Sequence, residues 1–238
     1  MNTRSLLLSL RRAFAVWVML VLPATHAASR PNLEGVWKLS SSPSGLRPVD
    51  GSELPFTDVG RAQYTHNESA AAHKDFKFDL TTTRCSSPGL PRVMLMPKLI
   101  RIYQRQYIVT MLFEWNRLFR QIDMRSGPRQ KLDAPTMMGL SYGRWEDATL
   151  VVDSYDFSSQ KLLDGVIPSS EKLQLIERFR MSGRDTLEDR ITVKDPEVFT
   201  RDWDTVLTYN RRPDALFPFA EDVCLDHRVG VPPPLSSP

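Results

Sequence analysis

Alternating hydrophobic and polar positions dominate the middle and C-terminal parts of the chain and predict β-strands. Residues 172–181 and 186–194 alternate over their whole length, and the Ser-Gly-Arg-Asp sequence between them is typical of a tight turn. Residues 106–114 carry mostly apolar side chains on both alternating faces, which indicates a strand that is covered on both sides. The other predicted strands are residues 31–39, 99–104, 117–124, 142–146, 149–155 and 204–211.

One helix is predicted, and it lies before most of the strands. Thr57 is a suitable N-cap for a helix that begins at Asp58, although the positions that follow are only weakly amphipathic. Helical segments do not alternate with the strands, which argues against a parallel α/β sheet. A long antiparallel meander has to curl or close to hide its edges. We therefore predict a mainly β fold, an antiparallel up-and-down meander that closes into a barrel or half-barrel with one short N-terminal helix.

The first residues have the pattern of an export signal. Arg4, Arg11 and Arg12 precede the apolar run 13–22, which is too short to span a bilayer comfortably, and small residues lead to Ala27. We expect a signal peptide over residues 1–27 with cleavage near Ala27; the alternative is an uncleaved anchor. Residues 28–228 are predicted to form a single β-rich domain and the Pro-rich residues 229–238 a disordered tail. The expected location is periplasmic or secreted, with no stable membrane insertion after cleavage.

The net charge argues against a nucleic-acid partner, and the histidine spacing argues against a bound metal ion. The net charge of +3 is accounted for by the three arginines of the predicted signal peptide, so we expect no nucleic-acid partner. The histidines after residue 27 are His66, His73 and His227, and their spacing matches no common metal-ligand pair. We therefore expect no metal site, and no motif suggests a cofactor.

Cys85 and Cys224 are the only two cysteines of the chain. An even number of cysteines in an exported protein favours a disulfide. This disulfide would attach the C-terminal segment to an early loop, and the alternative is a pair of free thiols.

Four charged residues occur among apolar neighbours in the predicted strands: Arg120, Asp153, Glu177 and Asp189. A charge on an inward face is costly unless it is paired or meets water or a ligand. One interpretation is a structural pair of Arg120 with Glu177 or Asp153 that fixes strand register. The other is a wet pocket, in which Arg120 binds an anionic or carbonyl group and Glu177 or Asp153 acts as a general acid or base.

Two further features are candidates for function. Trp115 and Trp145, with the nearby Arg117, complete the set of predicted ligand-binding residues, although tryptophans on strands also serve as core packing. Ser141 stands in a Gly-x-Ser-x-Gly sequence, which matches the nucleophile elbow of serine hydrolases, and His227 lies downstream. The elbow requires a helix after the serine, whereas a strand is predicted here, so a glycine-flanked turn is the alternative.

Several segments form a recognisable set. They are the Met-Gly-x-Ser-x-Gly-Arg-Trp-Glu-x-x-Thr-Leu-Val-Val-Asp sequence within residues 137–153, and residues 85–92, 114–117, 177–180 and 195–203. Together they resemble a family of exported bacterial proteins of unknown function, over most of residues 31–226. This resemblance implies export and a β-rich fold but no chemistry. The family often has histidine in place of Leu140 and Gly-Asp in place of Asp147-Ala148, and the loss of the histidine weakens any mechanism that needs a base there.

The Gly35-Val36-Trp37 sequence is similar to the Gly-x-Trp element of lipocalins, which implies a lipocalin-like barrel. The first functional hypothesis is therefore periplasmic binding of a small, largely apolar molecule inside the barrel. The second is a cofactor-independent lyase, isomerase or hydratase on the same scaffold, using Glu177 or Asp153 with Arg120. The third is a structural protein whose barrel is filled by its own side chains.

Overall fold

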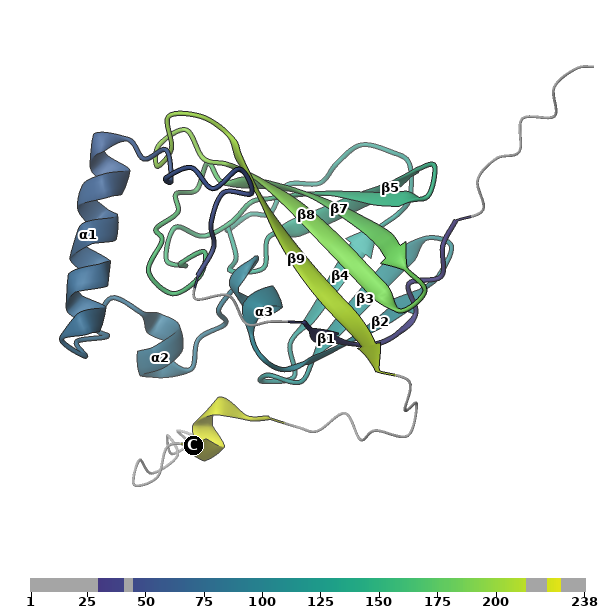
Figure 1. Ribbon diagram of the computed structural model, residues 1–238, viewed down its shortest axis with the longest axis horizontal. Helices are drawn as coiled ribbons and strands as arrows, with labels where there is room; N and C mark the ends of the chain where they lie inside the picture. Colours follow the sequence, from purple (N-terminus) through teal and green to yellow (C-terminus); the bar gives the residue numbers. More distant parts are fainter. Residues whose placement is uncertain (1–29, 41–44, 213–221, 228–238) are drawn as a thin grey trace, which may run out of the picture.

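The protein is built around one closed sheet of nine strands. The computed structural model describes residues 30–40, 45–212 and 222–227 (Figure 1). The strands follow one another around the barrel in chain order, and the last pairs with the first. They are β1 (Gly35–Leu39), β2 (Leu99–Gln104), β3 (Ile108–Phe113), β4 (Phe119–Asp123), β5 (Leu140–Glu146), β6 (Thr149–Tyr155), β7 (Gln174–Gly183), β8 (Thr186–Lys194) and β9 (Trp203–Arg212). The predicted mainly β barrel is confirmed, while the predicted signal peptide and Pro-rich tail lie outside the described residues.

The structure differs from a purely antiparallel meander at one pair of strands. Strands β4 and β5 run parallel and are paired only through Ile122 with Ser141 and Asp123 with Tyr142. All other neighbouring strands are antiparallel. Parallel neighbours need a crossover instead of a tight turn. Here residues 124–139 carry the chain back to the end of the sheet where β4 began, so β5 starts in the same direction.

The centre of the barrel is packed with side chains. Alternate residues of each strand point inward, and the largest of them are fully buried, including Trp37, Met111, Phe179 and Tyr209. The short helix α3 (Arg92–Leu95) adds Met94, whose carbonyl oxygen accepts a hydrogen bond of 2.9 Å from the Tyr209 hydroxyl. The cavity that these residues leave is about 10 Å³, room for one water molecule at most. Space for a ligand therefore has to be sought in the barrel wall.

Helix α1 (Asp58–Ala72) stands to one side of the barrel (Figure 1). It begins where the sequence predicts, because the Thr57 hydroxyl accepts a hydrogen bond of 3.0 Å from the Gly60 amide. Gly60 is required by close packing, since a Cβ atom there would lie 2.3 Å from the Val198 carbonyl oxygen. Within the described ranges, no helix is long and apolar enough to cross a membrane.

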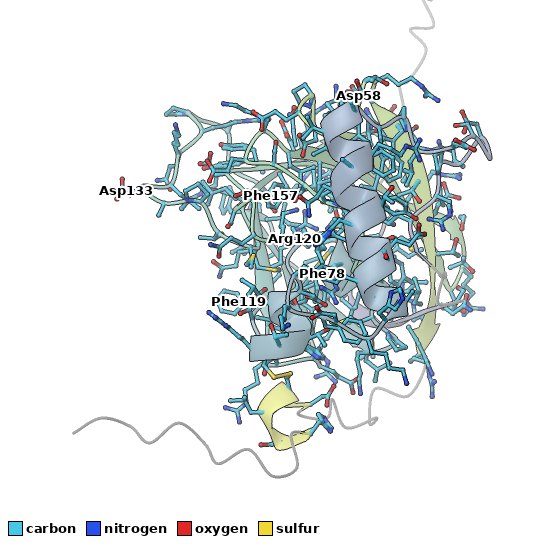
Figure 2. All side chains as sticks on the ribbon, turned by 90° about the vertical axis from the view of Figure 1, so that its left-hand side faces the viewer. Asp58, Phe78, Phe119, Arg120, Asp133 and Phe157 are labelled. Carbon is cyan, nitrogen blue, oxygen red and sulfur yellow. A yellow bond between two sulfur atoms is a disulfide. The ribbon has the colours of Figure 1, made fainter. Side chains whose placement is uncertain are left out.

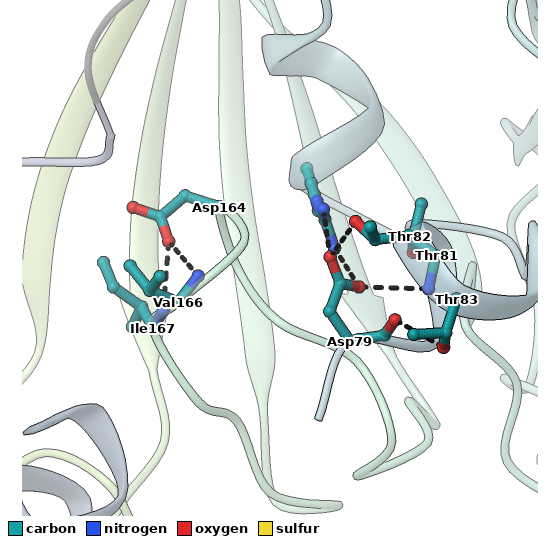
Figure 3. Close-up of polar contacts among 8 residues, drawn as sticks. Asp79, Thr81, Thr82, Thr83, Asp164, Val166 and Ile167 are labelled. Carbon is teal, nitrogen blue, oxygen red and sulfur yellow. Dashed lines mark hydrogen bonds and ion pairs between the residues drawn. The ribbon is translucent and has the colours of Figure 1, made fainter. Parts of the chain in front are cut away.

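Two helices that were not predicted occur in the segment between α1 and β2. Helices α2 (Leu80–Arg84) and α3 are too short to show a helical period in the sequence. The Asp79 carboxylate caps α2 through the Thr81 amide at 3.0 Å and binds both Nη atoms of Arg92 at 2.8 Å, which ties the two helices together (Figure 3). Asp164 organises a second loop in the same way, through the amides of Val166 and Ile167.

The predicted disulfide between Cys85 and Cys224 is confirmed. Cys85 ends α2, and Cys224 begins the short 3-10 helix η1 (Cys224–His227). The bond therefore fastens the C-terminal segment to a loop that lies 139 residues earlier in the chain.

Candidate functional site

A groove of about 860 Å³ lies in the barrel wall between β4 and β5. It exists because these strands pair at only two positions, so residues 119–121 and residues 138–140 are not joined by strand hydrogen bonds. A groove of this size suits a small organic molecule. Its lining is more apolar than polar and is formed by Tyr107, Ile108, Arg117, Leu118, Phe119, Arg120, Gln121, Asp123, Arg125, Gln130, Met138, Gly139, Leu140, Ser141 and Tyr142.

The inner side of the groove meets a buried polar network centred on Arg120. Figure 2 shows Arg120 near the middle of the molecule and the preceding residue, Phe119, toward its edge. Successive residues of a strand point to opposite faces of the sheet in this way. The Arg120 Nε donates to Ser141 Oγ at 3.0 Å, and its Nη2 donates to Ser154 Oγ at 2.9 Å. Its Nη1 donates to Glu177 Oε1 at 2.8 Å, and its Nη2 also binds Glu177 Oε2. The two serine oxygens are 2.9 Å apart.

The ion pair of Arg120 and Glu177, one of the two pairings predicted from the sequence, is therefore present. It joins β4 to β7 through the barrel interior, with side-chain exposures of 2 % and 0 %. Both Glu177 carboxylate oxygens are bound to Arg120, and Glu177 does not line the groove. This arrangement fixes the relative position of the strands and leaves Glu177 poorly placed to act as a general base toward a molecule in the groove.

The predicted alternative partner, Asp153, lies on the other side of the barrel wall. It binds Arg129 and accepts a hydrogen bond of 2.7 Å from Gln174 Nε2, so its pairing with Arg120 is not what the structure shows. The inward positions of β6 are Val152 and Ser154, which lie opposite Glu177 and Ser141 respectively. Asp153 is buried because the loop before β5 covers the outer face. Buried residues therefore occupy both faces of this strand, and the sequence alone could not assign the inward one.

That loop is held down by a stack of side chains. The Arg129 guanidinium carbon lies 5.7 Å from the Tyr142 ring centre and 5.8 Å from that of Tyr155, a cation–π arrangement. Gln130 donates its amide hydrogen to the Tyr142 hydroxyl at 2.8 Å, and its carbonyl oxygen accepts from the Tyr155 hydroxyl at 2.9 Å. Burial, together with the neighbouring Tyr142, raises the pKa of Tyr155 to about 12. The loop thereby brings Gln130 and Met138 to the groove.

Asp189, on β8, is an isolated carboxyl group in the barrel interior. It is fully buried, and neither carboxyl oxygen has a hydrogen-bond partner among the described residues. Burial and, next, the negative charge of Glu177 raise its pKa well above the ordinary value, against a smaller opposing effect of Arg120. Asp189 is therefore protonated in the folded protein at pH values where an exposed aspartate is ionised.

We expect Asp189→Leu to stabilise the protein by about 1–3 kcal/mol at pH 7, because it removes an unpartnered buried polar group. The folded state retains a proton that the unfolded state releases above about pH 4, so the wild type loses stability as pH rises through that value. The variant lacks this loss, and its advantage in urea unfolding should grow from pH 4 to pH 7. Asp189→Asn should remove the same pH dependence without the apolar gain. An unchanged pH slope in both variants contradicts the assignment.

Lys161 is a second buried ionisable residue, away from the groove. Its Nζ donates to the Leu90 carbonyl oxygen at 2.8 Å and lies 4.5 Å from the centre of the Phe157 ring. Burial lowers its pKa to about 7, although Asp195 opposes this shift. These contacts anchor the loop that carries α3 and Met94 to the segment after β6.

Only two of the six predicted ligand-binding residues line the groove. They are Arg117 and Arg120. Trp115 is bridged to Asp222 of the C-terminal segment, and Trp145 packs partly buried against the barrel core. The remaining two, Asp153 and Glu177, are placed as described above. The apolar wall was missed because it depends on the parallel pairing of β4 and β5, which no local pattern indicates.

Ser141 does not occupy a nucleophile elbow. It lies near the start of β5, which leads into β6 instead of a helix. Both glycines of the motif have a packing role. A Cβ atom on Gly139, whose φ is +62°, would lie 2.5 Å from the Tyr155 carbonyl oxygen, and one on Gly143 would lie 2.5 Å from Met124 Sδ. His227 binds Asp222 and is largely exposed.

The fold and the groove define an architectural class: a closed, mixed β-barrel with a packed centre and a groove in its wall. Among the described residues, no group of three or more His, Cys, Asp or Glu side chains is arranged to hold a metal ion. No model of a known protein family matches the chain. A comparison with curated proteins also finds no matching relative. The resemblance to a family of exported proteins therefore stays a prediction.

Proposed function

We propose that this protein binds a small, largely apolar molecule in the groove between β4 and β5. The observation that carries the proposal is the groove itself, with its volume of about 860 Å³ and its apolar walls. Aromatic and aliphatic side chains bind the body of such a ligand, and a few polar groups set its orientation. The site differs from the one expected from the sequence, because the ligand is held in the barrel wall and not at its packed centre.

We further propose that binding takes place outside the cytoplasm. The disulfide between Cys85 and Cys224 supports an oxidising compartment, because such bonds are rare in proteins kept in reducing surroundings. It agrees with the export signal predicted for residues 1–27. Sequencing the N-terminus of the protein recovered from the periplasm tests this part of the proposal, with cleavage near Ala27 as the expected result.

We expect Met138→Trp to weaken binding by about tenfold or more, because the larger side chain fills part of the groove. The measurement is a titration with the neutral apolar fluorophore N-phenylnaphthylamine. Phe76→Trp is the matched control, since it introduces the same residue at a partly exposed position that does not line the groove. Equal affinity of the wild type and both variants would place the fluorophore elsewhere and refute the groove as the site.

A further inference from the structure

The contacts of Arg120 show which acceptors of the buried network are already occupied. A guanidinium group has five N–H donors and no acceptor. Four of the donors of Arg120 are used, two by the oxygens of Glu177 and one each by Ser141 and Ser154. Each oxygen of Glu177 therefore already accepts a charged hydrogen bond. The network has no unused carboxylate to offer to the groove.

The two serine hydroxyls leave one hydrogen atom over. Each serine oxygen accepts from Arg120, and the single contact of 2.9 Å between them uses one of their two hydrogen atoms. The other hydrogen needs an acceptor elsewhere. Ser154 is completely buried and does not line the groove, whereas Ser141 does. The free-energy penalty of an unpartnered hydroxyl hydrogen is smallest where a ligand or water can accept it. Ser154 therefore donates to Ser141, and the Ser141 hydrogen faces the groove.

The environment of Ser141 makes this hydroxyl a good donor. Its oxygen accepts from the cationic Arg120, and a hydroxyl that accepts a hydrogen bond from a charged group donates more strongly in turn. Arg120, the other network member that lines the groove, is likewise a donor only. The two network side chains that line the groove therefore favour an acceptor oxygen and give an N–H or ammonium group no side-chain acceptor.

The walls of the groove determine which polarity and charge suit the remainder of the ligand. Ile108, Leu118 and Phe119 give the groove an apolar side, while Arg117 and Arg125 lie at its rim. Asp123 is the only carboxylate among the lining residues, and it is bound by Arg125. The lining therefore offers a cationic ligand no carboxylate that is not already bound by an arginine.

We propose that the ligand of this groove is an apolar molecule with a carbonyl or carboxylate oxygen, which accepts a hydrogen bond from the Ser141 hydroxyl. This inference rests on the proposed binding function and specifies its ligand class. Ser141 acts here as a binding residue whose hydrogen is directed outward by Ser154, Arg120 and Glu177. The role replaces the nucleophilic one suggested by the Gly-x-Ser-x-Gly sequence.

The experiment compares three probes that share one apolar chain: dodecanoate, methyl dodecanoate and dodecylammonium. Each displaces N-phenylnaphthylamine from the wild-type protein. We expect the ammonium probe to need about tenfold more concentration than the better of the two oxygen-bearing probes, because Ser141 and Arg120 present donors to it and no side-chain acceptor. The ratio between dodecanoate and its methyl ester separates a carboxylate ligand from a neutral carbonyl ligand. Equal displacement by all three probes overturns the inference.

The variants Ser141→Ala and Ser169→Ala form a matched pair. Each removes one buried serine hydroxyl, but the Ser169 hydroxyl donates to the Lys161 carbonyl oxygen and does not line the groove. Affinity for the preferred probe should fall about tenfold in Ser141→Ala, stay within about twofold of the wild type in Ser169→Ala and be retained in Ser141→Thr. An equal loss in the two alanine variants contradicts the role of Ser141.

Failure of this inference is distinguishable from failure of the binding function. If the fluorophore binds the wild type and Met138→Trp weakens it, the groove is a binding site whatever the ranking of the probes. If the fluorophore does not bind, the function itself is refuted. Thermal unfolding of each variant shows whether it is folded, and the ranking of probes on the wild type requires no variant.

Discussion

Replacing Arg120 by methionine is expected to lower the free energy of unfolding by about 3–5 kcal/mol. The substitution leaves Glu177 fully buried without the cation that binds both of its oxygens. It also removes the donors to Ser141 and Ser154. A buried charge that loses its only counter-charge costs far more than the pair contributes when intact. Urea unfolding of the variant and the wild type at pH 7 measures the difference.

The double variant Arg120→Met with Glu177→Met is the control for this prediction. It removes both charges together, so neither member of the pair is left buried without its counter-charge. Its stability should return to within about 1–2 kcal/mol of the wild type, since well-packed apolar residues often replace a buried ion pair at little cost. A single variant that unfolds within about 1 kcal/mol of the wild type would contradict a buried, mutually dependent pair.

Removing the disulfide is expected to have an effect of similar size. In Cys85→Ser with Cys224→Ser, the free energy of unfolding should fall by up to about 5 kcal/mol, because the unfolded chain regains the freedom of a long closed loop. The cysteines are 139 residues apart. In the folded state, Cys224 donates its amide hydrogen to Asn116 Oδ1 at 3.3 Å, and the Asn116 amide donates to the Asp222 carbonyl oxygen at 2.6 Å. In the variant these contacts, together with the Lys98–Asp222 ion pair of 3.0 Å and the hydrogen bond of 3.2 Å from the Asp222 amide to the Glu114 carbonyl oxygen, have to hold the C-terminal segment.

Urea unfolding with and without a reducing agent tests the prediction. The reductant should destabilise the wild type and leave the double serine variant unchanged. Limited proteolysis adds an independent measurement, since residues 222–227 should become accessible first when the disulfide is lost. A reductant effect below about 1 kcal/mol would show that the loop-closure argument overestimates this bond.

The two predictions concern neighbouring parts of the groove. Arg120 supports its inner side, while the C-terminal segment contacts Asn116 in the turn between β3 and β4, next to Arg117 at the rim. Arg117 has a φ of +54°, which is uncommon for a residue other than glycine. Loss of the disulfide should therefore also weaken binding of N-phenylnaphthylamine, whereas a change confined to stability would separate the C-terminal segment from the groove.

Several features of this protein follow from its sequence alone. Strict alternation over residues 172–181 and 186–194 predicts the long hairpin of β7 and β8, because a half-buried strand presents successive side chains to opposite environments. Thr57 predicts the start of α1, since its side chain satisfies an amide that the helix leaves unpaired. The cysteine count predicts the disulfide, and charges placed on apolar faces predict an ion pair of Arg120 with Glu177 or Asp153, of which the structure has the first.

Other features were decided only by the tertiary structure. The alternation of apolar and polar residues indicates that a residue is buried. It does not indicate which strand lies beside that residue or in which direction the neighbouring strand runs. The parallel pairing of β4 and β5, and hence the groove, depends on the path of residues 124–139. The same path covers Asp153 on the outer face, and Met94 fills the barrel from a helix too short to leave a periodic signal. Local patterns thus determined the strands and two candidate partners for Arg120, whereas closure of the barrel determined which of them pairs with it and where a ligand has room to bind.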